Sequence, residues 1–273
     1  MPEAFAPALS APAPSIRLRS LALPSEHGGW GLLGEPIVVG LAIAPSWPGV
    51  GVALLAAFAF LARHPLKLAA ADWRQGRRSP RTIACERIAL LYGSGAAAGL
   101  ALATAGASSF WVPLAAALPL ALFQLAHDAR NRGRALGPEL AGGIALGAVA
   151  AAELLAGGAP HLTAWVVWAL LAAKAVGAVL YVRARLRCDR GVPASRTGVL
   201  AAHAGLLALT ILLSVRGPGP WLAAAAAGAL LARAWYGLSR FHRRVRPQAV
   251  GFTEMAYGIL FAAALAVGCA SGW

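Results

Sequence analysis

The chain has 273 residues, of which 59% are hydrophobic and 12% are charged, a composition that excludes an ordinary soluble globular domain. Apolar runs of about 17–25 residues recur along it, long enough to cross a bilayer core of about 30 Å. The formal net charge is +14, but the basic residues gather in the loops between apolar runs. We therefore expect an all-α, polytopic membrane bundle whose charges face membrane lipids and not nucleic acid.

Nine apolar segments are predicted to span the membrane, as one domain over residues 21–273. The segments are 27–46, 49–71, 82–105, 110–127, 138–157, 162–182, 197–215, 220–240 and 251–271. Residues 1–20, rich in Pro and Ala near the start, are predicted to form a disordered N-terminal tail. The three cysteines show no metal-ligand spacing, and disulfides are not expected.

The loops between these segments alternate in charge. One set is short and uncharged apart from Arg216, and the other set is strongly basic. The positive-inside rule places the basic loops and the N-terminus in the cytoplasm and, with nine spans, the C-terminus outside. Tryptophans recur at the opposite boundary, as in an interfacial aromatic belt: Trp47, Trp111, Trp165, Trp221 and Trp273.

The run PSEHGGWGLLGEP, residues 24–36, opens the first apolar segment and carries three ionisable residues. Glu26 suits a helix N-terminus, and His27 can donate or accept a proton near neutral pH. Glu35 lies a little over two helical turns later, so it projects to roughly the same side as His27. We treat His27 and Glu35 as candidate catalytic groups and Glu26 as a substrate contact. The alternative is that the histidine only caps the helix or lies at the interface.

Other ionisable residues inside the apolar segments each need a partner or a water-filled cavity. Glu35, Lys174 and Arg233 lie well inside their segments, toward the ends joined by basic loops. This distribution predicts a polar cavity that opens to the cytoplasm beneath an apolar outer half. The alternative is that Glu35 and Lys174 form a buried pair that holds two helices together. Glu153 is expected near the outer boundary, within reach of water.

Arginine, lysine and aspartate recur in the basic loops and at the helix ends that precede them. We expect these residues to bind an anionic headgroup at one cytoplasmic mouth. The substrate-binding candidates are Arg63, His64, Lys67, Arg74, Asp128, Lys174, Arg185 and Asp189, and Asp72 is a further catalytic candidate. The alternative is that each aspartate caps a turn, while the arginines set topology and contact anionic lipids.

Two stretches carry a family resemblance. The sequences PSEHGGWG and FLARHPLKLAAADWRQGRRSPRT resemble the YwiC-like family of bacterial integral membrane proteins, and we expect the resemblance to cover nearly the whole chain. It implies a bacterial cytoplasmic membrane location. The architecture also resembles the UbiA-type intramembrane prenyltransferases, in which nine spans surround a cavity and Asp-rich loops bind a prenyl diphosphate through Mg²⁺.

The Asp-rich motifs of the UbiA type are incomplete in this chain. In HPLKLAAAD, His64 stands in the place of the first Asn and only Asp72 remains of the acids. Asp189 has Arg185 four residues before it, where the second motif has an acid. Single carboxylates among arginines are a weak site for Mg²⁺, the one cofactor that the resemblance implies, whereas arginine binds phosphate directly.

The sequence therefore predicts a membrane protein that binds an amphiphile with a phosphate or diphosphate headgroup. If the protein is an enzyme, we expect a divergent prenyltransferase-like activity. One alternative is a non-catalytic membrane assembly partner. The other is a transporter of a small anion or metabolite that uses Glu35, Lys174 and Arg233. Neither the presence of chemistry nor the oligomeric state follows from the sequence.

Overall fold

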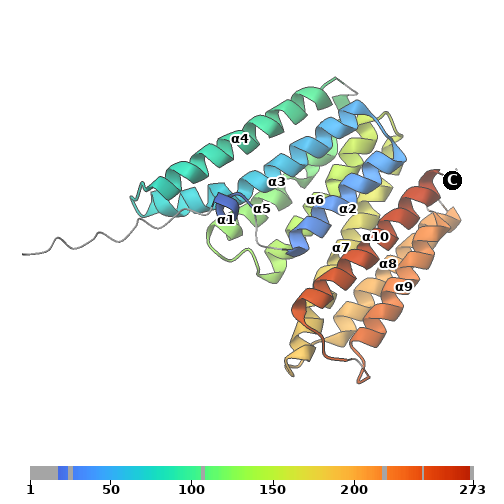
Figure 1. Cartoon of the computed structure of the whole chain (residues 1–273). Coiled ribbons are helices and arrows are strands. Elements are labelled where there is room, and N and C mark those ends of the chain that lie inside the picture. The colour runs from blue at the N-terminus through green and yellow to red at the C-terminus, as the bar shows by residue number, and fades with distance from the viewer. Residues whose placement is uncertain (1–17, 24–26, 106–107, 217–219, 242, 271–273) are drawn as a thin grey trace, which may run out of the picture.

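The computed structural model describes residues 18–23, 27–105, 108–216, 220–241 and 243–270. These ranges are helical apart from short connections, and they contain no strand (Figure 1). The elements are α1 (Leu18–Ala22), α2 (His27–Ile43), α3 (Trp47–Arg74), α4 (Pro80–Ala103), the short 3-10 helix η1 (Ser108–Phe110), α5 (Trp111–Ala129), α6 (Leu136–Ala156), α7 (His161–Asp189), α8 (Arg196–Arg216), α9 (Trp221–Gly237) and α10 (Pro247–Ala270).

A helix occupies each of the nine predicted segments, so the all-helical, membrane-type fold is confirmed. Within the described ranges, six helices are long and apolar enough to cross a membrane: α3, α5, α6, α7, α8 and the part of α10 from Pro247 to Cys269. The apolar helices α2 and α9 have 17 residues each, or about 26 Å, shorter than the bilayer core. Nine crossings and the orientation of the termini therefore stay predictions.

The sequence sets the helix ends where capping residues and proline coincide. Ser46 accepts a hydrogen bond from the backbone N–H of Gly49 at the start of α3. Ser79 and Thr82 form a reciprocal capping box at the start of α4, which satisfies backbone donors that have no partner within the helix. Pro80 follows Ser79 directly and Pro48 stands two residues after Ser46, so both lie in the first helical turn, where a missing N–H has no cost.

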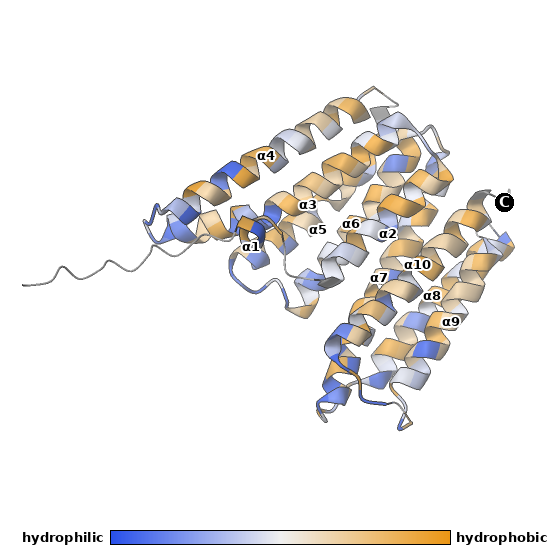
Figure 2. Cartoon of the chain, viewed as in Figure 1, coloured by the Kyte–Doolittle hydropathy of each residue, from blue (hydrophilic) through white to orange (hydrophobic). Residues whose placement is uncertain are grey.

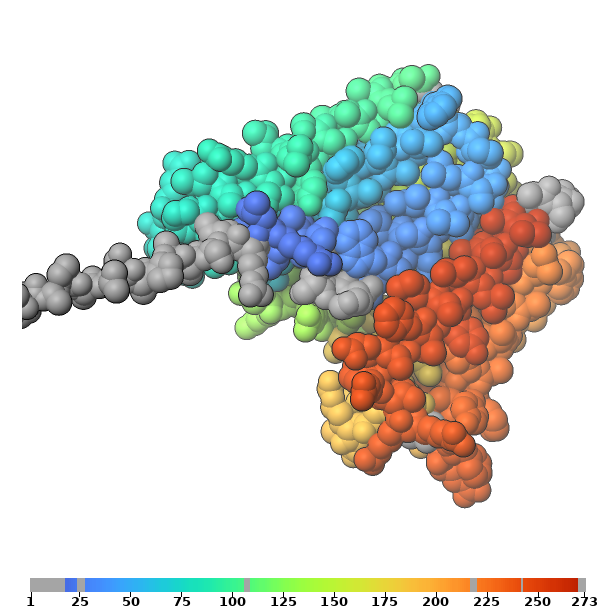
Figure 3. Space-filling model, viewed as in Figure 1, coloured from blue at the N-terminus to red at the C-terminus, as the bar shows by residue number. Residues whose placement is uncertain are grey.

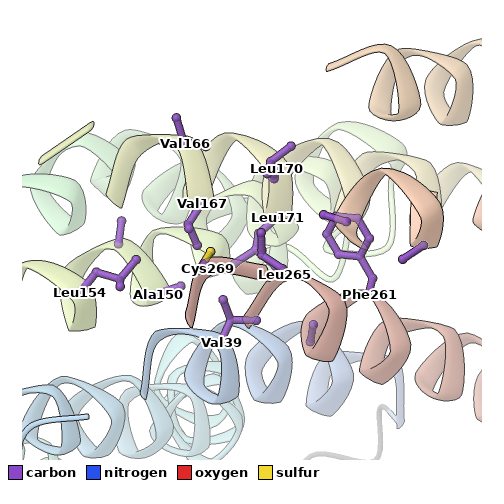
Figure 4. Close-up of a cluster of buried hydrophobic side chains, with 14 of the residues drawn as sticks. Val39, Ala150, Leu154, Val166, Val167, Leu170, Leu171, Phe261, Leu265 and Cys269 are labelled. Atoms are coloured by element: carbon purple, nitrogen blue, oxygen red, sulfur yellow. The ribbon is translucent and has the colours of Figure 1, made fainter. Parts of the chain in front are cut away.

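Helix α6 lies at the centre of the bundle and packs against α2, α3, α5 and α7. The hairpin of α3 and α4 lies on one side of it, and α8, α9 and α10 lie on the other (Figure 1). Helix α10 runs beside α2 on the face shown in Figure 3. The largest apolar cluster of the described residues joins α2 and α6 to the helices α7–α10, through side chains such as Val39 of α2, Leu154 of α6, Leu171 of α7 and Leu265 of α10 (Figure 4).

Hydrophilic residues gather at helix ends, whereas the helix bodies are mostly apolar (Figure 2). The blue ends include the turn between α3 and α4 and the connections that follow α7 and α9. These are the basic loops of the sequence, and they lie at the ends opposite the connections between α2 and α3 and between α4 and α5 (Figures 1 and 2). This arrangement fits the alternation of loop charge along the chain.

Two details differ from the sequence-based expectations. Helix α1 begins at Leu18, inside the segment 1–20 predicted as a tail, because Leu21 packs into a small apolar cluster with Ala69 and Cys85. Glu153 does not reach water: its side chain is fully buried, and its carboxyl lies against the backbone of Gly40 on α2. Glu153 lies near the end of α6, but the tight packing of α6 on α2 keeps water away from its carboxyl group.

Candidate functional site

Three cations of α3 contact the end of α5, two of them at the carboxylate of Asp128. Lys67 Nζ lies 2.7 Å from Asp128 Oδ1, and Arg63 Nε lies 3.6 Å from Asp128 Oδ2. Arg74 Nη2 donates to the backbone carbonyl of the next residue, Ala129, at 2.8 Å. Arg63, Lys67 and Arg74 stand at i, i+4 and i+11, which places them on one face of the helix. We call these three cations and Asp128 the basic cluster.

The basic cluster is rich in positive charge. Within the described part of the chain, it places three cations of α3 beside the carboxylate of Asp128. The side chains of Arg63, Lys67 and Asp128 are 20%, 29% and 12% exposed, so the cluster is partly desolvated and still open to a ligand. Partial burial strengthens charge interactions relative to bulk water. The arrangement can bind an anion, with Arg63 as a planar fork and Lys67 as a point charge.

The opening motif of the sequence packs onto this cluster through Phe60. A Cβ on Gly29 would lie 2.9 Å from the Phe60 ring, so a larger residue at position 29 would require this ring to move. The Trp30 ring meets Phe60 edge-on at 5.6 Å between centroids, and the Arg63 guanidinium lies 5.2 Å from the Phe60 centroid. The two stretches that carry the family resemblance therefore meet in space.

The remaining residues of the opening motif lie apart from the basic cluster or outside the described part of the chain. Glu26 lies outside the described residues. His27 begins α2, and only its backbone is described. Glu35 pairs with Lys174 of α7, whose Nζ donates to both carboxylate oxygens at 2.6 and 2.5 Å. The buried-pair alternative for Glu35 and Lys174 thus matches the geometry.

The Glu35–Lys174 pair depends on a glycine that sequence reasoning did not single out. Gly258 of α10 lies directly against the pair, and a Cβ there would stand 2.9 Å from Lys174 Nζ and 2.6 Å from the carboxyl carbon of Glu35. Lys174 is only 3% exposed and Glu35 10%. The pair therefore joins α2 to α7 and packs against α10, with both charges largely buried.

Other predicted headgroup residues have partners that hold the fold. Asp72 accepts a hydrogen bond from Thr82 Oγ1 at 2.9 Å, which fastens α3 to the start of α4. Arg185 pairs with Asp189 at 3.1 Å and donates to the carbonyl of Gly237 at 2.5 Å. It also donates to the carbonyl of Arg243, so it holds the loop between α9 and α10.

The expected headgroup residues fall into two groups. The basic cluster lies near the ends of α3 and α5, whereas Arg185 and Asp189 lie at the end of α7, well apart from the turn between α3 and α4 (Figure 1). His64 has a different partner from either group. Its Nε2 lies 3.1 Å from the carbonyl oxygen of Ser20, a contact that joins α1 to α3. The candidates that the structure brings together at α3 and α5 are thus those of the basic cluster.

The donor set does not fit the Mg²⁺ site that the UbiA-type resemblance implies. Mg²⁺ needs carboxylates that converge with phosphate oxygens. Asp72 and Asp189 lie on different helices and each has a polar partner. Among the described residues, no group of three His, Cys, Asp or Glu side chains could hold a metal ion. No step through Mg²⁺ is derived for this chain.

Sequence reasoning missed several aromatic residues at these sites. Trp30 and Phe60 lie beside the basic cluster, and Tyr181 and Tyr257 lie beside Arg233 in the C-terminal half. A signal was available for Phe60, because it precedes Arg63 and Lys67 at helical spacing. No comparable signal existed for the two tyrosines, because their contacts join separate helices.

The comparisons with known proteins cover part of the chain. Residues 23–154 match the family model described as YwiC-like protein. This match runs from just before α2 to near the end of α6 and includes the whole basic cluster, but not Lys174, Arg185 or Asp189. It is narrower than the nearly full-length resemblance expected from the sequence. No curated protein and no solved structure matches the chain. From α2 to α6, the chain is thus similar to the YwiC-like family.

Proposed function

We propose that this chain is a YwiC-like, multi-pass membrane protein that binds an amphiphile by its phosphate or diphosphate headgroup. The basic cluster carries the proposal. Arg63, Lys67 and Arg74 lie on one face of α3 beside the carboxylate of Asp128, and they remain partly exposed. Ordinary topology-setting arginines in loops have no reason to share one helix face with a buried carboxylate beneath them.

On headgroup binding, the cations of the cluster would exchange contacts with Asp128 for contacts with phosphate oxygens. Asp128 holds Lys67 and Arg63 in place when no ligand is bound. A phosphate oxygen would compete with Asp128 for Lys67 Nζ, while the Arg63 fork binds two oxygens at once. The apolar tail would run along the lipid-exposed apolar residues near these helix ends, which include Leu66, Leu122 and Phe123.

The proposed location follows the charge of the loops. The ends of α3 and α5 lead into basic loops, so the site would face the cytoplasm at the inner leaflet of a bacterial cytoplasmic membrane. If the protein also catalyses prenyl transfer, His27 or Glu35 would act as an acid or base, and the protein would be a divergent prenyltransferase. Because Lys174 neutralises Glu35, the geometry supports binding more strongly than transfer.

Binding of farnesyl diphosphate to the detergent-purified protein tests the proposal. We expect Lys67→Gln to raise the Kd about tenfold, since it removes one charge-assisted hydrogen bond to phosphate. Binding should weaken with added salt and persist when EDTA removes Mg²⁺. The matched control is Arg190→Gln, which removes one exposed positive charge from the loop after α7.

The thermal midpoint of each variant confirms that it is folded. Equal Kd values for wild type, Lys67→Gln and Arg190→Gln would contradict the proposal. Loss of binding on EDTA treatment would also contradict it, because it would place a metal between the headgroup and the protein. No binding to wild type would leave the assembly-partner function as the better account.

A further inference from the structure

A second polar site lies in the C-terminal half and shares no residue with the basic cluster. Arg233 of α9 pairs with Glu254 of α10, near the Glu35–Lys174 pair that α2 and α7 contribute. Glu254 and Gly258 stand one helical turn apart on α10, so the same face of this helix meets both pairs. We call Arg233, Glu254, Lys174 and Glu35 the charged junction.

The guanidinium of Arg233 is held in place from several sides. Its central carbon, Cζ, lies 4.0 Å from the centroid of the Tyr181 ring and 5.0 Å from that of Tyr257. Its Nη1 donates to Glu254 Oε2, and the side chain is 8% exposed. Stacking between aromatic rings is a preferred setting for arginine, so the orientation of the fork is fixed.

One edge of this fork has no partner. Arg233 Nε and Nη2 are buried and make no hydrogen bond within the described part of the protein, and the same is true of Glu254 Oε1. Nε and Nη2 form the edge of arginine that binds two oxygens of one carboxylate or phosphate group. Leaving charged donors buried without acceptors is costly, so these atoms point to a ligand.

The unmatched atoms specify the chemistry of that ligand. Two donors of Arg233 need an oxyanion, and one acceptor of Glu254 needs an N–H or O–H donor. The charged junction holds two cations and two carboxylates and is neutral, so a ligand that is also neutral overall fits it without burying net charge. An oxyanion joined to an ammonium group meets these conditions.

We propose that Arg233 and Glu254 bind a small zwitterion or zwitterionic headgroup, with its carboxylate or phosphate on Arg233 and its ammonium on Glu254. Arg233 lies one turn from the end of α9 and Glu254 lies two turns into α10. The site is therefore near helix ends that adjoin a basic loop, at a depth that both a lipid headgroup and a soluble molecule can reach. Phosphatidylethanolamine and free phosphoethanolamine represent the two sources.

Lipid retention by the purified full-length chain tests the lipid source. Native mass spectrometry compares phosphatidylethanolamine with phosphatidylcholine, whose quaternary ammonium has no N–H to give to Glu254. We expect wild type to prefer phosphatidylethanolamine by about tenfold, the effect of one charge-assisted hydrogen bond. Arg233→Lys keeps the charge but lacks the fork, and Glu254→Gln weakens the acceptor, so both should abolish the preference. Arg240→Gln, an exposed arginine after α9, should preserve it.

Thermal shifts with phosphoethanolamine and phosphocholine test the soluble source. A shift with phosphoethanolamine alone, absent in Arg233→Lys, supports the site with a free ligand. Equal retention of both lipids by wild type, together with no difference between the soluble pair, overturns the proposal without any need for a folded variant. Lys67→Gln should leave these results unchanged, which separates failure here from failure of the basic cluster.

Discussion

Lys174 is the residue whose loss should damage the fold most clearly. It is 3% exposed and serves both oxygens of Glu35. Lys174→Met would leave Glu35 buried without its cation, at a cost of about 3–5 kcal/mol in unfolding free energy. The double variant Glu35→Gln with Lys174→Met should recover most of this loss, because no charge then remains unpaired.

Reversible unfolding in mixed micelles measures both variants, with Arg190→Gln as the control for loss of one positive charge. If the double variant is no more stable than Lys174→Met, the pair is not the reason for the loss. The sequence could indicate that Glu35 and Lys174 pair, because both are charged and lie at similar depth. The sequence could not indicate that Gly258 packs against the pair, since that contact depends on how α10 crosses α2 and α7.

The same limit applies to the basic cluster at the scale of residues. The spacing of Arg63 and Lys67 indicates from sequence that they share a face of a helix, whereas Arg74 lies beyond the expected end of that segment at residue 71. Their partner Asp128 lies 61 residues after Lys67, and only the packing of α3 on α5 selects it. Sequence placed all four residues among the headgroup candidates, but it could not separate them from Arg185 and Asp189.

Among the helices, the hairpin of α3 and α4 illustrates how small residues determine packing. A Cβ on Gly99 of α4 would stand 2.5 Å from the backbone nitrogen of Leu55 on α3, so the backbones meet where neither helix has a side chain in the way. Because backbone cannot move aside as a side chain can, Gly99→Ala should push the helices apart and destabilise the protein by about 1–3 kcal/mol.

Gly93 on the same helix provides the matched control. A Cβ there meets nothing within 4 Å, so Gly93→Ala should be neutral or stabilise the helix by up to about 1 kcal/mol. Thermal unfolding of the two single variants makes the comparison. Equal effects at the two positions would show that the close approach of α3 and α4 is not required.

Helix positions could be predicted from hydropathy because each long apolar run needs its backbone hydrogen bonds satisfied internally. The ends were less predictable. Helix α7 continues to Asp189, beyond the expected end at residue 182, because arginines remain good helix formers after the apolar run stops. Helix α1 was not predicted, since a five-residue helix is stabilised by the contacts of Leu21 and not by local propensity.

For the whole molecule, the order of helices along the chain did not reveal which basic loops lie together. The sequence suggested one mouth surrounded by three similar loops. The structure separates the end of α3 from the end of α7, because α2 and α6 lie between the α3–α4 hairpin and the last helices (Figure 1). The basic cluster falls within the YwiC-like match, while most of the charged junction lies beyond residue 154.

Photocrosslinking tests most directly whether the basic cluster is the headgroup site. The probe is a farnesyl diphosphate analogue with a diazirine in the isoprene unit next to the diphosphate. We predict adducts on peptides from the C-terminal ends of α3 and α5, suppressed by excess farnesyl diphosphate and reduced in Lys67→Gln at probe concentrations below the Kd of the variant. Adducts confined to α7–α10, or adducts that excess farnesyl diphosphate does not suppress, would contradict the assignment of this site.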